Sequence, residues 1–296
     1  MIYLRSFEFL SQGDEDGYLS TPRPNCYDTK YPFGVFRYRE LPAFEFAPVT
    51  ILYGTDGSGK TTLLNIMAEK LGVRHRTIYN RTPFFADYVD MCRCDLSPRF
   101  DEQVLSRSKI LTSDDVFNHL IDVRHINQGV DRRREELFEE YAALRRDQTN
   151  PMGCSFRMRS LDDYETLKKY TDIPKKASMT KYVQKRGVRN IDSRSNGEEA
   201  LRFFTEQIEE NAVYFLDEPE NSLSACNQQK LLGFIEDSAR FFGCQFVLSS
   251  HSPFFLAAQD ARIYNLDETP PIPQKWTELE NVRAYFELFD RHREEF

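Results

Sequence analysis

The chain is poor in the residues that build metal sites and disulfide frameworks. Its 296 residues include one tryptophan, five histidines and six cysteines. The cysteines are Cys26, Cys92, Cys94, Cys154, Cys226 and Cys244, and no two of them form a C-x-x-C pair. Cys92 and Cys94 have no histidine near them in the sequence, which argues against a zinc site there. We interpret the thiols as reduced and mostly structural.

Long apolar runs and an excess of positive charge are also lacking. No run approaches the ~18 apolar residues that a membrane span needs. The first ten residues, MIYLRSFEFL, alternate apolar and polar side chains as a strand does, and they lack the layout of a signal peptide. The formal net charge of −8 argues against a general, charge-driven binder of nucleic acid or membranes. These features predict a globular cytoplasmic protein without a membrane span.

The stretch VTILYGTDGSGKTTLLNIM, which begins at Val49, is the strongest signal in the chain. An apolar run typical of a strand precedes the sequence G-x-x-x-x-G-K-T, and a helical pattern follows it, as a phosphate-binding loop requires. We predict that Lys60 reaches the β- and γ-phosphates and that the Thr61 hydroxyl is a ligand of Mg²⁺. The predicted nucleotide-binding residues here are Gly54, Thr55, Asp56, Gly57, Ser58, Gly59, Lys60, Thr61 and Thr62. The motif predicts that the chain binds a nucleoside triphosphate.

A second motif, NAVYFLDEPENSLS, lies far downstream. The apolar run from Val213 to Leu216 ends in Asp217, as expected of a strand whose carboxyl end faces the nucleotide in a parallel sheet. We predict that Asp217 holds the Mg²⁺ ion and that Glu218 is the general base or water-orienting group at the γ-phosphate. The alternative is an ordinary strand that ends in an acidic turn at Pro219, and the upstream phosphate loop makes that alternative the weaker one.

A third motif, CQFVLSSHSPFFL, reads as a buried strand over 246–249 that delivers His251 to a loop before Pro253. A lone histidine after a strand is more often a capping or packed residue than a catalytic one. Its place downstream of the acidic strand favours a catalytic role here, so His251 joins Glu218 as a predicted catalytic residue.

The stretch NIDSRSNGEEALRFF contains a turn, Ser195–Asn196–Gly197–Glu198, that opens into a predicted helix. Taken alone, an ordinary N-cap is the commoner explanation, because serine and asparagine satisfy the free donors of a first helical turn. The alternative is an anion site, because a helix N-terminus with a permissive glycine suits phosphate.

Taken together, these motifs and their order resemble the ABC-class ATPases over Val49–Leu256. The S-x-G-E, D-E-P-E and S-S-H-S-P sequences are similar to the soluble branch with SMC-type, RecF-like and overcoming-lysogenization-defect ATPase heads, and most of all to small stand-alone bacterial ATPases. The resemblance implies that two subunits enclose ATP and Mg²⁺ head to tail. It also implies that Ser195, Asn196, Gly197 and Glu198 form the signature loop facing the partner's γ-phosphate, that residues 221–224 form the D-loop, and that His251 is the switch histidine.

The resemblance predicts the fold class as well. We expect an α/β P-loop NTPase: an ABC-type ATPase head with a mainly parallel core sheet, an antiparallel N-terminal β portion and an inserted helical lobe. The chain would form a single ATPase domain, with residues 1–111 and 199–296 in the nucleotide-binding core and 112–198 in the lobe. The stretch DRRREELFEEYAALRR, over 131–146, predicts a charged helix with a solvated face. Near the end, Thr277 and Glu280 fit a capping box.

Two features depart from the ABC pattern. No glutamine occupies an obvious Q-loop, and the best positional candidate, 112–115, reads T-S-D-D. We prefer to interpret that segment as a helix N-cap with acidic first-turn residues, which the helix dipole favours. The aromatic side chain that stacks on adenine in transporters also has no clear counterpart. Phe36 and Tyr38 are candidates, although we favour a place in the core of a strand for both.

The leading functional prediction is a soluble Mg²⁺-dependent ATPase that forms an ATP-dependent homodimer and switches a protein partner or effector, in DNA repair, phage defence or effector control. The alternatives are the nucleotide-binding subunit of a membrane transporter and a nucleotide-gated binding module with little turnover. A basic run without acidic residues is either a nucleic-acid surface or a solvated loop. Its cationic residues are Lys175, Lys176, Lys181, Lys185, Arg186 and Arg189.

Overall fold

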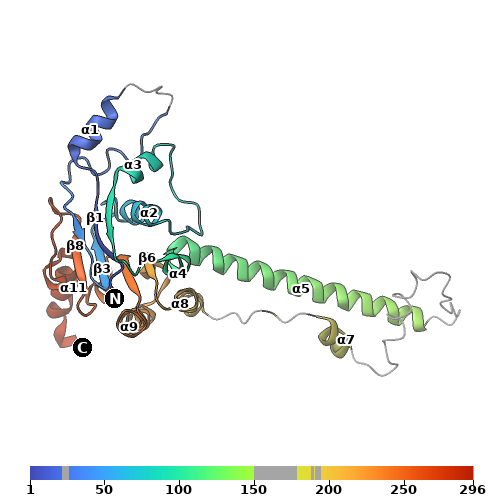
Figure 1. Ribbon diagram of the computed structural model, residues 1–296. Coiled ribbons are helices and arrows are strands. Elements are labelled where there is room, and N and C mark those ends of the chain that lie inside the picture. Colours follow the sequence, from blue (N-terminus) through green and yellow to red (C-terminus); the bar gives the residue numbers. More distant parts are fainter. Residues whose placement is uncertain (22–26, 150–178, 188–189, 191–194, 296) are drawn as a thin grey trace. The chain divides into compact units, whose positions relative to one another are not determined.

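The computed structural model describes residues 1–21, 27–149, 179–187, 190 and 195–295. The chain divides into two compact units. The first comprises Met1–Asn118 and Ser195–Phe296, and the second comprises His119–Arg194. Figure 1 shows the elements of both units. Of the basic run, Lys175, Lys176 and Arg189 lie outside the described residues, as do the side chains of Lys181 and Lys185.

A five-stranded parallel sheet forms the centre of the first unit, in the order β5-β6-β7-β3-β8. Its strands are β3 (Val49–Tyr53), β5 (Lys109–Thr112), β6 (Val213–Asp217), β7 (Gln245–Ser249) and β8 (Arg262–Asn265). Every residue of β3, β6 and β7 is buried. Continuous apolar runs are typical of strands covered on both faces, which explains why these three were recognisable in the sequence.

The register of this sheet brings the ends of four strands level. Thr112 pairs with Asp217, Asp217 pairs with Ser249, and Ser249 pairs with Leu52. All strands in the sheet are parallel, so their carboxyl ends share one edge. The segments that follow β3, β5, β6 and β7 therefore leave the sheet side by side, at the edge where parallel α/β sheets bind ligands.

A smaller antiparallel sheet contains β1 (Leu4–Glu8) between β2 (Phe44–Glu45) and β4 (Arg93–Leu96). The buried side chain of Gln245, at the start of β7, joins the two sheets. Its Oε1 accepts hydrogen bonds from the backbone N–H groups of Tyr3 and Leu4 at 2.8 Å each, and its Nε2 donates to the Leu4 carbonyl at 2.8 Å. The predicted parallel core with an antiparallel N-terminal portion is confirmed.

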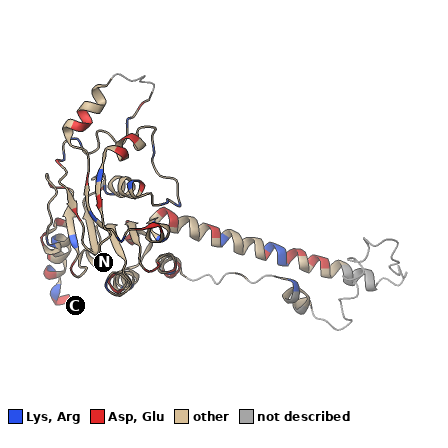
Figure 2. Ribbon diagram, in the orientation of Figure 1, with Lys and Arg blue, Asp and Glu red and all other residues tan. Residues whose placement is uncertain are grey.

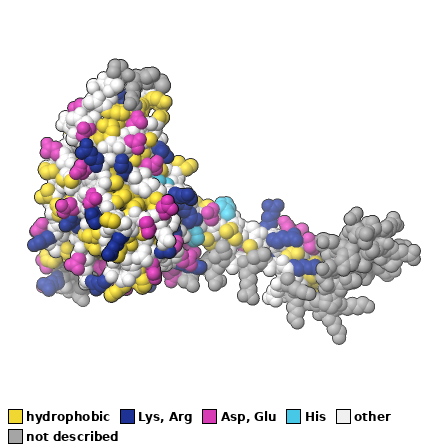
Figure 3. Space-filling view, viewed as in Figure 1, with side chains coloured by type: hydrophobic (Ala, Val, Ile, Leu, Met, Phe, Trp, Pro, Cys, Tyr) yellow, Lys and Arg dark blue, Asp and Glu magenta, His cyan; other side chains and the backbone are white. Residues whose placement is uncertain are grey.

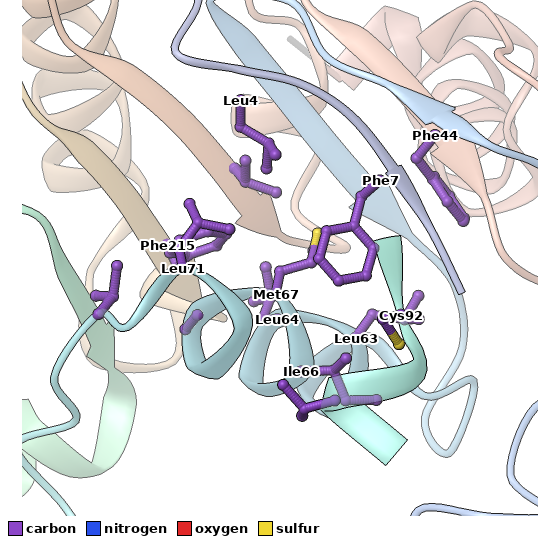
Figure 4. Packing of buried hydrophobic residues seen from close by; sticks show 14 of the residues in the cluster. Leu4, Phe7, Phe44, Leu63, Leu64, Ile66, Met67, Leu71, Cys92 and Phe215 are labelled. Atoms are coloured by element: carbon purple, nitrogen blue, oxygen red, sulfur yellow. The ribbon is translucent and has the colours of Figure 1, made fainter. Parts of the chain in front are cut away.

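The main hydrophobic core lies around helix α2 (Lys60–Leu71). Leu63, Leu64 and Met67 of α2 pack close to Phe7 of β1, and Phe215 of β6 belongs to the same cluster (Figure 4). These side chains are almost completely buried. The helix that follows the phosphate loop is thus fixed by apolar packing along its length, which holds its N-terminus steady at the sheet edge.

Further helices of the first unit surround these sheets (Figure 1). They are α1 (Gln12–Ser20), α3 (Phe85–Met91), α4 (Glu102–Arg107), α8 (Asn196–Gln207), the 3₁₀ turn η2 (Pro219–Ser222), α9 (Ala225–Phe241), α10 (Pro253–Leu256), the 3₁₀ turn η3 (Trp276–Glu278), α11 (Glu280–Arg291) and the 3₁₀ turn η4 (Arg293–Glu295). The predicted capping box at Thr277 and Glu280 is wrong. Thr277 lies in η3, and α11 begins after Leu279, which is 1% exposed and gives no side-chain cap.

The second unit contains α7 (Met179–Arg186) and most of α5 (Ser113–Thr149), whose first turns belong to the first unit. Leu137 and Tyr141 of α5 form a small buried cluster with Tyr182 and Val183 of α7. Acidic and basic residues are interspersed along α5 (Figure 2). Ion pairs within the helix join Arg132 and Arg133 to Glu136, Arg133 to Glu140, and Arg134 to Asp131. The charged helix predicted over 131–146 therefore lies inside α5.

The visible face of the first unit carries interspersed acidic and basic side chains (Figure 3). This face therefore has no dominant basic patch, which agrees with the formal net charge of −8 for the whole chain. Within the part of the chain that the structure describes, no helix is both long enough and apolar enough to cross a membrane.

Candidate functional site

The phosphate loop connects the end of β3 to the start of α2, and its backbone requires glycine at two positions. Gly57 and Gly59 have φ values of 80° and 97°, in the left-handed region that favours glycine. A Cβ atom on Gly59 would also lie 2.5 Å from Cε1 of Phe36, whose ring is buried. The backbone conformation therefore favours glycine at both positions, and the packed ring of Phe36 leaves no room for a side chain at position 59.

Lys60 stands at the first position of α2 and is 5% exposed. Its ammonium group donates to the carbonyl of Gly54 at 2.9 Å and to that of Thr55 at 3.2 Å, and it lies 3.3 Å from Oε1 of Glu218. The cation is thus held inside the phosphate loop. A buried ammonium needs compensating partners, and two carbonyls with one carboxylate supply them.

Thr61 and Asp217 meet across the sheet edge. The Thr61 hydroxyl lies 3.1 and 2.9 Å from the two carboxylate oxygens of Asp217, and the Ser249 hydroxyl lies 2.5 Å from Oδ1. Burial raises the pKa of Asp217, and the hydrogen bonds from Ser249 and Thr61 oppose that shift. The charge of Lys60 also lowers the pKa of Asp217, whereas the neighbouring Glu218 raises it. A cation bound at this buried carboxylate would stabilise its charged form further.

Glu218 follows directly and adopts a left-handed conformation, with φ 46° and ψ 55°. This conformation costs a residue other than glycine about 1–2 kcal/mol. The Ser249 carbonyl and hydroxyl both accept from the Glu218 N–H, at 3.2 and 3.0 Å. Oε1 faces Lys60, and Oε2 accepts from the Asn221 amide at 2.9 Å. The turn thus directs the Glu218 carboxylate toward the phosphate loop, where a narrow cleft of about 220 Å³ lies among Gly57, Lys60 and Glu218.

Glu220 is a site residue that the sequence analysis did not single out. It is 7% exposed, and its Oε1 accepts from the backbone N–H of His251 at 2.8 Å. The imidazole of His251 itself is 44% exposed, with Nδ1 at 3.5 Å from that oxygen. The second glutamate of D-E-P-E and the serines around His251 were the available signals, but their contact depends on the sheet order that places β6 beside β7.

The predicted signature turn begins α8. The hydroxyl of Ser195 accepts from the backbone N–H of Glu198 at 3.4 Å, so the N-cap is present. Ser195, Asn196 and Glu198 are exposed. Gly197 lies against the start of α9, where a Cβ atom would be 3.2 Å from Nδ2 of Asn227. The turn therefore presents its polar side chains to solvent, and its part in binding a partner's phosphate stays a prediction.

The segment 112–115 forms the N-cap that we preferred over a Q-loop. The Asp115 carboxylate accepts from the backbone N–H of Thr112 at 2.9 Å, and the Thr112 hydroxyl accepts from the backbone N–H of Asp115 at 3.2 Å. This reciprocal pair is a capping box at the start of α5. The same segment borders a cleft of about 370 Å³ that Thr61 and Asp217, the predicted Mg²⁺ ligands, also line.

The two aromatic candidates for adenine differ in their surroundings. Phe36 is 3% exposed and belongs to the hydrophobic core, whereas Tyr38 is 71% exposed with the Arg37 guanidinium 5.4 Å from its ring centroid. Both occupy turns between α1 and β2 rather than a strand. The strand-core interpretation is therefore wrong for Tyr38, and Phe36 is a core residue that closes the phosphate loop from outside any strand.

The residues at this edge fit a nucleoside triphosphate with Mg²⁺. The left-handed glycines and the buried ammonium suit phosphate oxygens. Thr61 and Asp217 supply the oxygen donors that Mg²⁺ prefers. Among the described residues no group of three or more His, Cys, Asp or Glu side chains could hold a metal ion by itself.

A family model described as "AAA domain, putative AbiEii toxin, Type IV TA system" matches residues 95–257. This match covers more than half of the chain and includes the acidic strand and His251. The chain belongs to this family. With its phosphate loop at the end of a central parallel strand, it has the fold of a P-loop NTPase, as the motifs predicted. No curated protein matches the chain.

Solved structures with a similar arrangement include two SMC head domains. That from Pyrococcus furiosus, bound to the C-terminal domain of ScpA, is 13% identical over 99% of this chain and 100% of its own, with a TM-score of 0.45. That from Thermotoga maritima is 13% identical over 92% and 99%, with a TM-score of 0.41. A dimeric ATP-binding cassette with ADP and Pi is 13% identical over 80% and 90%, with a TM-score of 0.37.

Proposed function

We propose that the chain binds ATP with Mg²⁺ at the phosphate loop and hydrolyses it between two copies arranged head to tail. One observation carries the proposal. Lys60 and Thr61 at the start of α2 contact Glu218 and Asp217 at the end of β6, residues that lie more than 150 positions away in the chain. The site thus brings together a cation and a hydroxyl from the start of α2 and two carboxylates from the end of β6, beside a loop with left-handed glycines. This set of groups suits phosphoryl transfer to water.

The contacts of Lys60 suggest how binding prepares the site. In the present structure its ammonium is shared between two loop carbonyls and Glu218. Phosphate oxygens are stronger acceptors than carbonyls, so Lys60 turns to them when ATP binds. Glu218 then loses its cationic partner and is available to orient the attacking water. Mg²⁺, when bound, neutralises charge on the phosphates, and Thr61 and Asp217 would hold it.

The second half of the site would come from another copy of the chain. The exposed polar turn at Ser195–Glu198 supports this assignment, because Ser195, Asn196 and Glu198 lie exposed at the N-terminus of α8, and a helix N-terminus favours an anion. We propose that it contacts the γ-phosphate held by the partner. Charge stabilisation at the transferred phosphate would then require both copies, which couples ATP binding to dimerisation.

We further propose that this cycle switches a protein partner in the cytoplasm. The description of the family names a toxin of a toxin–antitoxin system, which favours effector control over DNA repair among the outputs that the sequence allows. A nucleic-acid partner has no support from the described residues, because most of the basic run lies outside them.

Calorimetry with Mg²⁺ and ATP tests the binding half of the proposal. Lys60→Ala removes the one side-chain cation inside the loop, so we expect it to lose most of the ATP affinity. Lys70→Ala is the matched control, because Lys70 stands in the last turn of the same helix and donates to the Asp90 carbonyl at the surface. ATP binding by Lys60→Ala with the affinity of the unmodified chain would exclude this loop as the site.

A further inference from the structure

A buried carboxylate, Glu220, organises the loop that carries His251. Glu220 lies in the η2 turn after Pro219 and is 7% exposed. Its Oε1 accepts from the Ser250 hydroxyl and the His251 backbone N–H, both at 2.8 Å, and from the Ser252 backbone N–H at 3.3 Å. One oxygen of a side chain on the acidic-strand turn therefore gathers three consecutive residues of the histidine loop.

The other oxygen of Glu220 is unused. Oε2 is buried and has no hydrogen-bond partner among the described residues. Buried oxygens without partners are rare, and each calls for a functional or structural reason. The His251 imidazole lies close to this carboxylate, with Nδ1 at 3.5 Å from Oε1, at ion-pair distance but beyond a good hydrogen bond. The carboxylate thus has spare acceptor capacity next to a ring that is 44% exposed.

We propose that Glu220 is the positioning residue of His251. On this assignment, which rests on the proposed place of His251 at the γ-phosphate, the carboxylate accepts the Nδ1–H of the imidazole when ATP is bound and directs Nε2 at the phosphate. The ring then lies between two anions. An imidazole that donates from both nitrogens carries a proton on each, so the ATP-bound ring takes a second proton from solvent and is a cation.

Two other side chains hold the same loop and make the proposal testable. Gln228 accepts from the Ser252 hydroxyl at 2.6 Å and donates to the Leu223 carbonyl at 3.0 Å, and the Asn281 amide donates to the His251 carbonyl at 2.7 Å. In Glu220→Gln the amide oxygen can still accept from Ser250 and the loop N–H groups. We therefore expect the loop to keep its conformation and to lose only the charge beside Nδ1.

The kinetic test compares Glu220→Gln with the unmodified chain. We expect kcat to fall about 10- to 100-fold, less than the 10²–10⁴-fold effect of losing a proton-transfer group, while the Kd of MgATP changes less than about threefold. In a His251→Gln background, Glu220→Gln should lower kcat no further, because Glu220 acts through the imidazole. The matched control is Glu295→Gln, which removes the carboxylate from an exposed His292–Glu295 pair at 2.8 Å and should leave both constants unchanged. If Glu220→Gln lowered kcat by the same factor in the unmodified chain and in the His251→Gln variant, the proposal would be overturned.

A spectroscopic test separates this inference from the proposed hydrolysis. In ¹⁵N-histidine spectra of the MgATP-bound Glu218→Gln variant, we expect the His251 nitrogens to show a proton on each, and Glu220→Gln in that background to leave one proton on the ring. The His251→Gln variant assigns the signal, and His292 serves as an internal reference. An unchanged His251 signal in Glu220→Gln would overturn the inference. A chain that binds MgATP but never hydrolyses it would instead overturn the proposed function.

Discussion

Replacing Ser195 with arginine separates a structural cap from a site that faces a partner's phosphate. The Ser195 hydroxyl accepts a hydrogen bond from the Glu198 N–H, and the 3.4 Å length of this bond exceeds the usual 2.7–3.2 Å. Loss of an N-cap costs about 0.5–2 kcal/mol, and this long, exposed bond belongs at the lower end, near about 0.5 kcal/mol. For a domain of this size that corresponds to a Tm lower by roughly 1–2 °C.

The fold should therefore survive, whereas the proposed function should not. If Ser195 contacts the γ-phosphate of the partner copy, the arginine side chain blocks the closed dimer. We expect ATP binding at the phosphate loop to persist and kcat to fall about 10²–10³-fold, the usual effect of losing one transition-state donor. Ser11→Arg is the matched control, because Ser11 caps α1 with a capping box to Asp14 and has no part in the proposed site. It should lower Tm at least as much and leave turnover unchanged.

Thermal denaturation, calorimetry and a steady-state ATPase assay decide the matter. Undiminished turnover by a folded Ser195→Arg variant would refute the assignment of the signature loop and leave the turn as an ordinary helix cap.

Two further predictions concern stability. Gly59→Ala should lower the free energy of unfolding by at least about 2 kcal/mol in urea titrations, because its φ of 97° is strained for alanine and the new Cβ meets Phe36; Gly233→Ala, in the open middle of α9, should raise it by about 0.5–1 kcal/mol. Burial raises the pKa of Glu15, so the folded state holds that proton more tightly than the unfolded state. Stability from this group is complete below about pH 4 and is lost as pH rises through the folded-state pKa, and Glu15→Gln should flatten that decline. Equal changes in the free energy of unfolding for Gly59→Ala and Gly233→Ala would contradict the first account. A stability that falls with rising pH as steeply in Glu15→Gln as in the unmodified chain would contradict the second.

The elements that carry the site were predictable because their sequences agree with their surroundings. The strands over 49–53, 213–217 and 246–249 read as apolar runs since both faces of the central sheet are covered. The N-cap at 112–115 was predicted correctly because threonine and aspartate three residues apart can cap each other without help from the rest of the fold.

Features that depend on distant contacts were missed or wrong. Glu220 reaches the histidine loop only because β6 and β7 are neighbours in the sheet. Phe36 is buried in a turn by the phosphate loop rather than in a strand. At α11, burial of Leu279 sets where the helix begins, and the local capping signal of Thr277 and Glu280 is overridden. The sequence spacing of these residues contains none of this information.

The mass of the Glu218→Gln variant with ATP tests the central claim most directly. The amide keeps the shape of the side chain and removes the charge beside Lys60, so ATP should bind while turnover falls about 10²–10⁴-fold. Light scattering after gel filtration with Mg²⁺ and ATP should then give twice the 34.8 kDa of one chain, and one chain without ATP. Glu236→Gln, at a half-buried carboxylate of α9 that accepts from the Gln259 N–H, should behave as the unmodified chain. Normal hydrolysis by Glu218→Gln, or arrested hydrolysis at a mass that ATP never changes, would contradict the account.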